Sequence, residues 1–459
     1  IADNFINTWI IDGINAGRVT SSEAGTVIFT GFKNLGGGNK DDRFAFEALG
    51  KVDGLVDGGA HENFDIIDLS KSNNSNVVIA STGDSLGFIN IEKYIGNNTS
   101  STFTGANILN NWVLSGTNSG VLNNTIQFEN FGELRGGSVQ DNFKIENATI
   151  SGSIDAGDGN DTFDIRASAI AGKIKAGNGD DRFIFTIIPG AEGIATIEGG
   201  DGDNRLTVEG GEAAYKAVHQ VGGLEYASAN NNISTISYTG FANIFDNVLA
   251  DSLSIFGTSA PDILRLQTSR YDVNGGATVN YTNKSNLNVN GAVDDKAIVD
   301  GVVSVDTSVT FNNLQVLAGN AGKIQTRSLE FINTGDVGSS SNRLGTVVTD
   351  LSLTATNGKI FLDEQDNLQL KNFNVSTTDL IDLKVGSNLS SVGALSYTGT
   401  FNVESLRGNI DFGASNALSG TLNLRASGNV SLGNAQSLLL GDVFAQNANI
   451  SSGGSIKGN

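Results

Sequence analysis

The chain has 459 residues, a formal net charge of −21 and 39% hydrophobic residues, with 59 Gly, 2 Pro and neither Cys nor Met. This apolar content suffices for a packed core, while the acidic excess argues against nucleic acid and anionic lipid surfaces as partners. The lack of Cys excludes disulfides and thiolate metal ligands, and no run of 18 apolar residues marks a membrane span.

Acidic glycine turns recur in the first half of the chain. Residues 156–164 and 176–184 fit the nonapeptide G-G-x-G-x-D-x-U-x, where U is large and apolar, with Ala for the first Gly. Such nonapeptides form calcium-binding turns in parallel β-rolls. Degenerate copies begin at four earlier or later glycines: Gly37, Gly58, Gly136 and Gly199.

The apolar position of this motif gives a register. It falls at Phe44, Phe64, Phe143, Phe163, Phe183 and Leu206. The steps are 20 residues or close to it, and the long gap after Phe64 spans about four of them. A constant step of this size predicts a solenoid in which each coil lies on the previous one.

A longer repeat overlies the short one. Residues 7–17 match residues 110–120, and each copy holds one of the only two tryptophans, Trp9 and Trp112. The blocks that follow also match, with a period of about 100 residues. Equivalent positions in a repeat favour a packing role for both indoles, in preference to sugar-stacking platforms.

The later part of the chain changes pattern twice. Residues 212–221, EAAYKAVHQV, lie between two glycine pairs and predict a short helix. From about residue 340, apolar-x-apolar pairs such as Phe401/Val403 and Leu422/Leu424 alternate with Gly turns at the same step. This alternation predicts short, half-buried strands.

These patterns together predict an all-β fold, a right-handed parallel β-helix with coils of about 20 residues. We expect three regions along one continuous rod. Residues 1–210 carry the acidic Gly-Asp turns, residues 211–340 hold the helical excursion and irregular coils, and residues 341–459 form the regular C-terminal repeats. Because the chain opens on Ile1 within a strand-like pattern, we expect it to be part of a longer protein.

The turns predict calcium sites. Their backbone carbonyls and sixth-position carboxylates are the hard oxygen ligands that Ca²⁺ prefers. Stacking places Asp141, Asp161, Asp181 and Asn204 in a column, about 4.8 Å apart. The candidate ligands are Asp42, Asp141, Asp158, Asn160, Asp161, Asn178, Asp180, Asp181, Asp201, Asp203 and Asn204. The alternative is that Asn and Asp serve only the geometry of tight turns.

Enzymatic chemistry is weakly indicated. The only histidines, His61 and His219, have neither catalytic nor metal-site spacing, so both are expected on the surface or in turns. The basic group of Arg166, Lys173 and Lys175 is interpreted as a solvated face of the coil. We therefore predict no catalytic residue and no enzyme.

The C-terminal run 351–459, with LSLTATNGKIFL, LRGNIDFGA and LNLRASGNVSLG, resembles the repeats of filamentous-haemagglutinin-like exoproteins. These are large adhesins of Gram-negative bacteria, exported by two-partner secretion. The first 210 residues are similar to degenerate RTX-type calcium turns. The resemblance implies a right-handed parallel β-helix, an extracellular location at the cell surface and an outer-membrane transporter as partner of the full-length protein. The degenerate nonapeptides and the missing secretion domain depart from the family pattern.

The function predicted is that of a structural and adhesive rod segment in a secreted surface or biofilm-matrix adhesin, stiffened by calcium. Its binding partners would be exopolysaccharide, host or bacterial cell surfaces, or further copies of itself. It would bind no nucleic acid and insert into no membrane. Two alternatives remain open: a calcium-dependent polysaccharide lyase or epimerase built on a β-helix, and the shaft of a contact-dependent toxin-delivery exoprotein.

Overall fold

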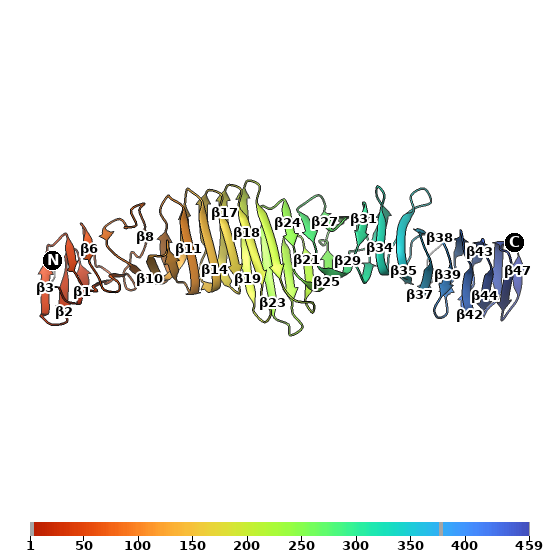
Figure 1. Ribbon diagram of the computed structural model, residues 1–459, viewed down its shortest axis with the longest axis horizontal. Coiled ribbons are helices and arrows are strands. Elements are labelled where there is room, and N and C mark those ends of the chain that lie inside the picture. The colour runs from red at the N-terminus through yellow and green to blue at the C-terminus, as the bar shows by residue number, and fades with distance from the viewer. Residues whose placement is uncertain (1–3, 376–379, 459) are drawn as a thin grey trace. The chain divides into compact units, whose positions relative to one another are not determined.

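The computed structural model describes residues 4–375 and 380–458 of the chain (Figure 1). The predicted all-β class is confirmed, because these residues form strands, turns and bends but no helix. Accordingly, the part of the chain described holds no helix that could cross a membrane.

The helix predicted for residues 212–221 is wrong. After a turn, this segment forms strand β21 (Lys216–Gln220), which pairs antiparallel with β22 (Gly223–Ala227). Tyr215, Ala217 and His219 are buried while the residues between them are more exposed, which is the period of two of a strand. The glycine pair that was expected to end a helix instead closes a hairpin.

The chain divides into two compact units, each described by itself. Unit 1 comprises Ile1–Gly211 and Asn230–Phe245, and unit 2 comprises Glu212–Ala229 and Asp246–Asn459. The predicted division into three regions stays a prediction.

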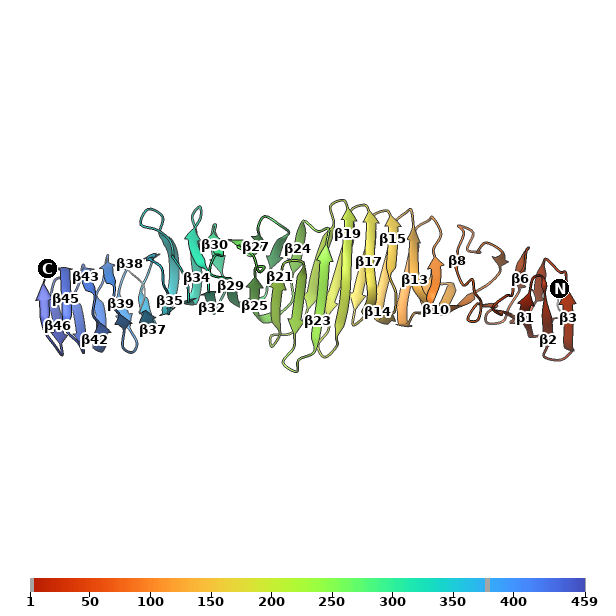
Figure 2. The same ribbon diagram turned by 180° about the vertical axis from the view of Figure 1, so that it is seen from behind.

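Unit 1 contains two series of parallel strands, whose members run side by side in Figures 1 and 2. One series is β14 (Asp141–Ile150), β16 (Thr162–Arg166), β18 (Arg182–Ile187) and β20 (Arg205–Gly210). The other is β13 (Ile126–Gly137), β15 (Ile154–Asp158), β17 (Ala169–Asn178) and β19 (Gly193–Asp201). Phe143 pairs with Phe163, Phe163 with Phe183 and Phe183 with Leu206, which confirms the predicted steps of 20, 20 and 23 residues.

The core of this region is a column of stacked rings. Phe143, Phe163 and Phe183 are buried, and their ring centroids lie 5.0 and 4.4 Å apart with interplanar angles of 6° and 11°. Offset stacking of this kind adds to the free energy gained by removing the rings from water. The Asp-x-Phe spacing of the sequence therefore sets the phase of successive strands.

The sheet is mixed, because antiparallel hairpins interrupt the parallel series. Strands β1 (Asn7–Gly13), β2 (Ala16–Ser21) and β3 (Gly25–Thr30) pair antiparallel, as do β11 (Asn110–Thr117), β12 (Gly120–Leu122) and β13. Trp9 stacks on Phe44 at 5.5 Å, and Trp112 stacks on Phe143 at 5.4 Å. Both indoles are buried, so the packing role predicted from the 100-residue duplication is confirmed.

The register predicted at Phe64 is wrong. Phe44 of β5 (Arg43–Phe46) pairs with Ile67 of β7 (Ile66–Asp68), and Ile67 pairs with Tyr94 of β10 (Lys93–Thr104). Phe64 lies in the preceding turn and is 37% exposed. The chain from the glycine pair to the stacked residue is two residues longer here than in the turn from Ala156 to Phe163, so the stacked residue is Ile67 and Phe64 falls three residues short of it.

Unit 2 also contains parallel strand pairs. Its C-terminal strands include β36 (Ile360–Glu364), β38 (Leu380–Val385), β41 (Thr400–Ser405), β43 (Thr421–Ala426) and β45 (Leu438–Phe444). A second series is β42 (Ile410–Leu418), β44 (Val430–Asn434) and β46 (Ala448–Ser452). Phe401 pairs with Leu422 and Val403 with Leu424, which confirms the predicted C-terminal step.

Asparagine ladders join successive turns of unit 2. The Asn367 side chain accepts from the Asn388 amide at 3.0 Å, Asn388 accepts from Asn409 at 2.9 Å, and Asn409 accepts from Asn429 at 2.7 Å. Each asparagine directly precedes a strand, so one side chain in each turn bonds to the backbone of the next. These ladders fix turn against turn where the acidic glycine motif no longer occurs.

Stacked glycines of unit 1 give a sharp test of this packing. A Cβ added at Gly177 would lie 1.8 Å from the Gly157 carbonyl oxygen, and Gly177 has φ of 107°. We expect Gly177→Ala to lower the free energy of unfolding by about 2–5 kcal/mol, from backbone strain and overpacking together. Gly83→Ala is the matched control, because its φ is 93° but nothing lies within 4 Å of the added Cβ. Equal losses in the two variants, measured by urea unfolding, would contradict the close approach.

Candidate cation-binding turns

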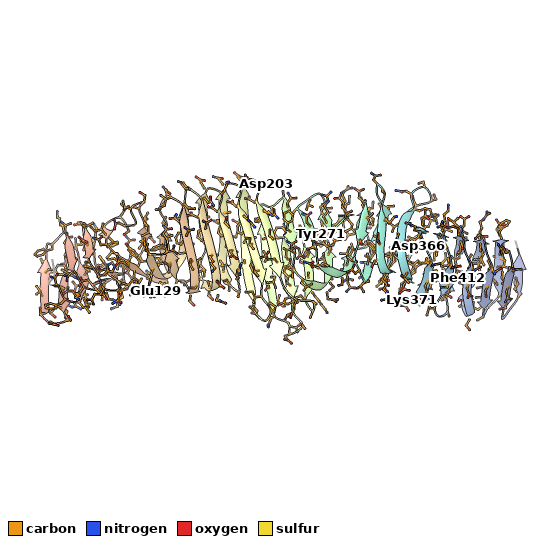
Figure 3. All side chains as sticks on the ribbon, in the orientation of Figure 1. Glu129, Asp203, Tyr271, Asp366, Lys371 and Phe412 are labelled. Atoms are coloured by element: carbon orange, nitrogen blue, oxygen red, sulfur yellow. The ribbon has the colours of Figure 1, made fainter. Side chains whose placement is uncertain are left out.

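The eleven predicted ligands divide into an inner and an outer set. Five are buried within unit 1: Asp42, Asp141, Asp161, Asp181 and Asn204. Six are exposed: Asp158, Asn160, Asn178, Asp180, Asp201 and Asp203. The motif thus supplies one inward side chain per turn, and the others point to solvent, as Asp203 does at the edge of the turns in Figure 3.

The inner set forms the predicted column. The backbone amide of Asp141 donates to Asp161 Oδ1 at 2.7 Å, and that of Asp161 donates to Asp181 Oδ1 at 2.8 Å. The amide of Asp181 then donates to Asn204 Oδ1 at 2.9 Å. Each side chain therefore caps the backbone of the previous turn, and the expected stacking of these four residues is confirmed.

The first block of the duplication has its own column, which includes Asp42. The Asn7 amide donates to Asp42 Oδ1 at 2.9 Å, and the Asp42 amide donates to Asp65 Oδ1 at 2.7 Å. The Asp65 amide donates to Glu92 Oε2 at 2.9 Å. Asp65 and Glu92 were missed by the motif, although each stands two residues before a stacked apolar residue, as Asp161 stands before Phe163.

The second carboxylate oxygen of the inner aspartates is the unusual feature. Oδ2 of Asp42, Asp161 and Asp181 is buried and accepts no hydrogen bond from the described residues. Burial raises the pKa of Asp42 to about 6 and that of Asp161 to about 7, and burial also raises the pKa of Asp181. A buried carboxylate of this kind requires either a proton or a cation.

The outer residues form exposed ladders of their own. Asn178 Nδ2 donates to Asp158 Oδ1 at 2.7 Å, and the Asp180 amide donates to Asn160 Oδ1 at 2.9 Å. The Asp203 amide donates to Asp180 Oδ1 at 2.8 Å. These contacts join successive turns, which is also what the turn-geometry alternative requires.

The glycines test how well the turns fit calcium. Gly157, Gly159, Gly177 and Gly179 have φ between 102° and 140°, a backbone conformation that glycine adopts without steric cost. The Gly157 carbonyl oxygen faces the Cα of Gly177, because a Cβ there would meet it at 1.8 Å. Ca²⁺ takes six to eight oxygen ligands. The inner Oδ2 atoms fit a cation, whereas these carbonyls are directed along the stack.

Unit 2 holds a buried charged cluster that sequence reasoning missed. His219 Nε2 lies 3.0 Å from Asp246 Oδ2, and Lys284 Nζ lies 3.2 Å from Asp246 Oδ1. All three side chains are fully buried, so the surface or turn position expected for His219 is wrong. His219 Nδ1 is 2.8 Å from the hydroxyl of Tyr271, which Figure 3 labels. The three residues are far apart in the sequence and share no motif.

Charge compensation holds this cluster in the core. Burial alone would raise the pKa of Asp246, but His219 and Lys284 hold it below its ordinary value of 3.8. Burial lowers the pKa of Lys284, and Asp246 offsets part of that effect. Lys284 Nζ also donates to the carbonyls of Val248 at 2.6 Å and Thr282 at 2.8 Å. Such a buried, charge-compensated cluster is a structural element of the core.

Comparison of the chain with models of known protein families, and separately with curated proteins, found no match.

Proposed function

We propose that the chain is a right-handed parallel β-helix and serves as a structural, adhesive segment of a large secreted bacterial adhesin. The observation that carries the proposal is the parallel register, in which strands pair with a displacement of about 20 residues in both units. Right-handedness follows from the strong preference of parallel crossover connections for that hand.

A repetitive stack suits a spacer or binding stalk. Each turn repeats the same side chains on the next, as the asparagine ladder of unit 2 and the aspartate column of unit 1 do. Such a stack adds length with each repeat and presents a periodic polar surface. The net charge of −21 favours solubility and divalent cations over nucleic acid as partners.

The adhesive role has a direct test. We expect the chain, immobilised on beads, to retain bacterial cells or exopolysaccharide, or to bind further copies of itself. Beads carrying an acidic globular protein of similar net charge control for nonspecific electrostatic capture. If the immobilised chain retains none of these partners and does not self-associate, the adhesive role is contradicted.

Calcium binding at the inner column is part of the same proposal. The cation would lie against the buried Oδ2 atoms of Asp161 and Asp181, which have no other partner in the described part of the chain. It would remove the repulsion between stacked carboxylates that burial makes costly. The role of calcium would then be to stiffen the stack outside the cell.

Calcium is therefore expected to raise the melting temperature of unit 1. A ligand at 100 times its dissociation constant stabilises by about 2.7 kcal/mol, which corresponds to roughly 5–11 °C for a unit of this size. The tryptophan fluorescence of Trp9 and Trp112, both in unit 1, reports the transition in calcium and in chelator. The double variant Asp161→Asn with Asp181→Asn should lose most of the difference. Equal melting points of the unmodified chain in both buffers would sink the stabilising role.

A further inference from the structure

The first block of unit 1 gathers a histidine and two carboxylates at one corner of the stack. His61 lies in the turn between β6 (Val56–Gly59) and β7, Asp65 immediately precedes β7, and Glu92 immediately precedes β10. Ile66 pairs with Lys93, so Asp65 and Glu92 stand opposite each other on neighbouring strands. The turn then brings the imidazole over both acids.

The spacing of the three side chains matches one shared ion. His61 Nδ1 lies 3.1 Å from Glu92 Oε2 and 3.8 Å from Asp65 Oδ2, and the three ligand atoms all lie within 4.8 Å of one another. Two ligands bound tetrahedrally to Zn²⁺, each at about 2.0–2.1 Å, are about 3.4 Å apart. The two measured distances lie on either side of that value.

A buried, unpartnered oxygen points into the cluster. Asp65 is fully buried, and its Oδ2 accepts no hydrogen bond within the described ranges 4–375 and 380–458. Its Oδ1 is held by the Asp42 amide at 2.7 Å, while Glu92 Oε2 is held by the Asp65 amide at 2.9 Å. Outer hydrogen bonds of this kind orient metal ligands. These hydrogen bonds fix both carboxylates in place and leave Asp65 Oδ2 without a hydrogen-bond donor among the residues that the structure describes.

The donor set selects the class of ion. An imidazole nitrogen with two carboxylate oxygens suits zinc and similar transition metals, whereas Ca²⁺ and Mg²⁺ prefer oxygen alone. His61 and Glu92 are 34% and 22% exposed, so solvent can reach the cluster and fill a remaining coordination position.

The second block provides an internal comparison. There Asp161 and Asp181 occupy the same ladder positions as Asp65 and Glu92. The turn from Ala156 to Asp161 is two residues shorter than the corresponding turn from Gly58 to Asp65, and it carries no histidine. The longer turn of the first block is therefore what adds a nitrogen ligand to an otherwise repeated acid pair.

We propose that His61, Asp65 and Glu92 form a binding site for one divalent transition-metal ion of the Zn²⁺ class. The site is independent of the adhesive role and of calcium at the inner column. It would pin the long turn onto two successive strands at the corner of the first block.

Nitrogen NMR of histidine side chains tests the proposal on the unmodified chain, because only two histidines occur. The protein is freed of metal, saturated with Ca²⁺ so that calcium turns are filled, and titrated with Zn²⁺. We expect one equivalent of Zn²⁺ to shift the ring nitrogens of His61, while the buried His219 serves as the unchanged reference. If Zn²⁺ causes no saturable change in the ring-nitrogen signals of His61, the proposed site is overturned.

Calorimetric titration with Zn²⁺ supplies the second measurement. Loss of an outer-shell partner typically weakens metal binding about 10–100-fold, so His61→Ala and Glu92→Gln are expected to weaken it at least as much. Asp161→Asn is the control and should leave the Zn²⁺ affinity unchanged. Equal affinity in His61→Ala and the unmodified chain would show binding elsewhere and overturn the proposal. Tryptophan fluorescence checks that each variant is folded.

Discussion

Replacing Asp246 by alanine is expected to lower the melting temperature of unit 2 by roughly 6–20 °C. Asp246 is fully buried between His219 and Lys284, with contacts of 3.0 and 3.2 Å. Removing one partner of a buried ion pair costs about 3–5 kcal/mol, because the other charge is left uncompensated. For a unit of this size, each kcal/mol corresponds to roughly 2–4 °C.

The variant Lys284→Met in the Asp246→Ala background separates a lost pair from a stranded charge. If the stranded ammonium causes the damage, the double variant should be more stable than Asp246→Ala alone, since replacing both members by apolar groups is often close to neutral. Differential scanning calorimetry measures the unit 2 transition. Tryptophan fluorescence measures unit 1, which holds both Trp9 and Trp112, and should change less. A fall of less than about 2 °C in the melting temperature of unit 2 in Asp246→Ala would contradict a stabilising role for this ion pair.

The regular part of the fold could be predicted because short motifs recur along the sequence at the same interval at which the strands pair. Asp-x-Phe recurs at a constant step from Asp141 to Phe183, and apolar-x-apolar pairs do so from Phe401 to Leu432. In both cases the pairing partners are those expected. The spacing also placed Asn204 correctly next to Asp181 in the column, although the step from Asp181 to Asn204 is 23 residues, three longer than the preceding steps.

The errors arose where a local signal and the tertiary register disagree. Phe64 occupies the expected sequence position, but the longer turn around His61 gives the stacked position to Ile67. Residues 212–221 are rich in helix-favouring Ala, Glu and Lys, yet alternate burial and pairing of β21 with β25 (Ala250–Phe256) override that propensity.

The buried cluster of unit 2 lay outside the reach of sequence reasoning. His219, Asp246 and Lys284 are 27 and 38 residues apart, and neither interval is a repeat length. A short motif can predict contacts only between residues that are close in the sequence or separated by a constant repeat length. Contacts between strands that follow irregular loops leave no such trace, so only the folded structure brings these three residues together.

The second large effect is expected from pH. In chelator, unit 1 should become more stable as the pH falls from 8 to 5. A protein whose carboxylates form salt bridges instead loses stability as the pH falls. Burial raises the pKa of Asp161 and Asp65 to about 7, and that of Asp42 and Asp141 to about 6, against the ordinary aspartate value of 3.8.

The sign follows from proton binding. Between pH 4 and 7 the folded column holds more protons than the unfolded chain, so raising the pH removes stability over that window. The loss is complete above the folded pKa of about 7. Each pH unit by which a folded pKa exceeds the unfolded one corresponds to about 1.4 kcal/mol. Several aspartates titrate together, so we expect a total on the order of several kcal/mol.

Asn204 shows which substitution isolates this effect. It occupies the same column, accepts from the Asp181 amide through Oδ1, and donates through Nδ2 to the Gly200 and Gly240 carbonyls at 3.2 and 3.3 Å. Asp161→Asn keeps the acceptor for the Asp141 amide and removes the charge. In chelator at pH 8 this variant should be more stable than the unmodified chain, with a flatter pH dependence of the fluorescence melting temperature.

The proposed calcium ion would compete with protons for the same buried oxygens, so the calcium and pH experiments are informative together. If the cation lies against Oδ2 of Asp161 and Asp181, saturating calcium should prevent most of the loss of stability between pH 5 and 8, because the ionised carboxylates then have a partner. Proton binding alone predicts the same pH slope with and without calcium. A unit 1 whose stability rises with pH in chelator would contradict the raised pKa values of the column and remove the electrostatic reason for a cation there.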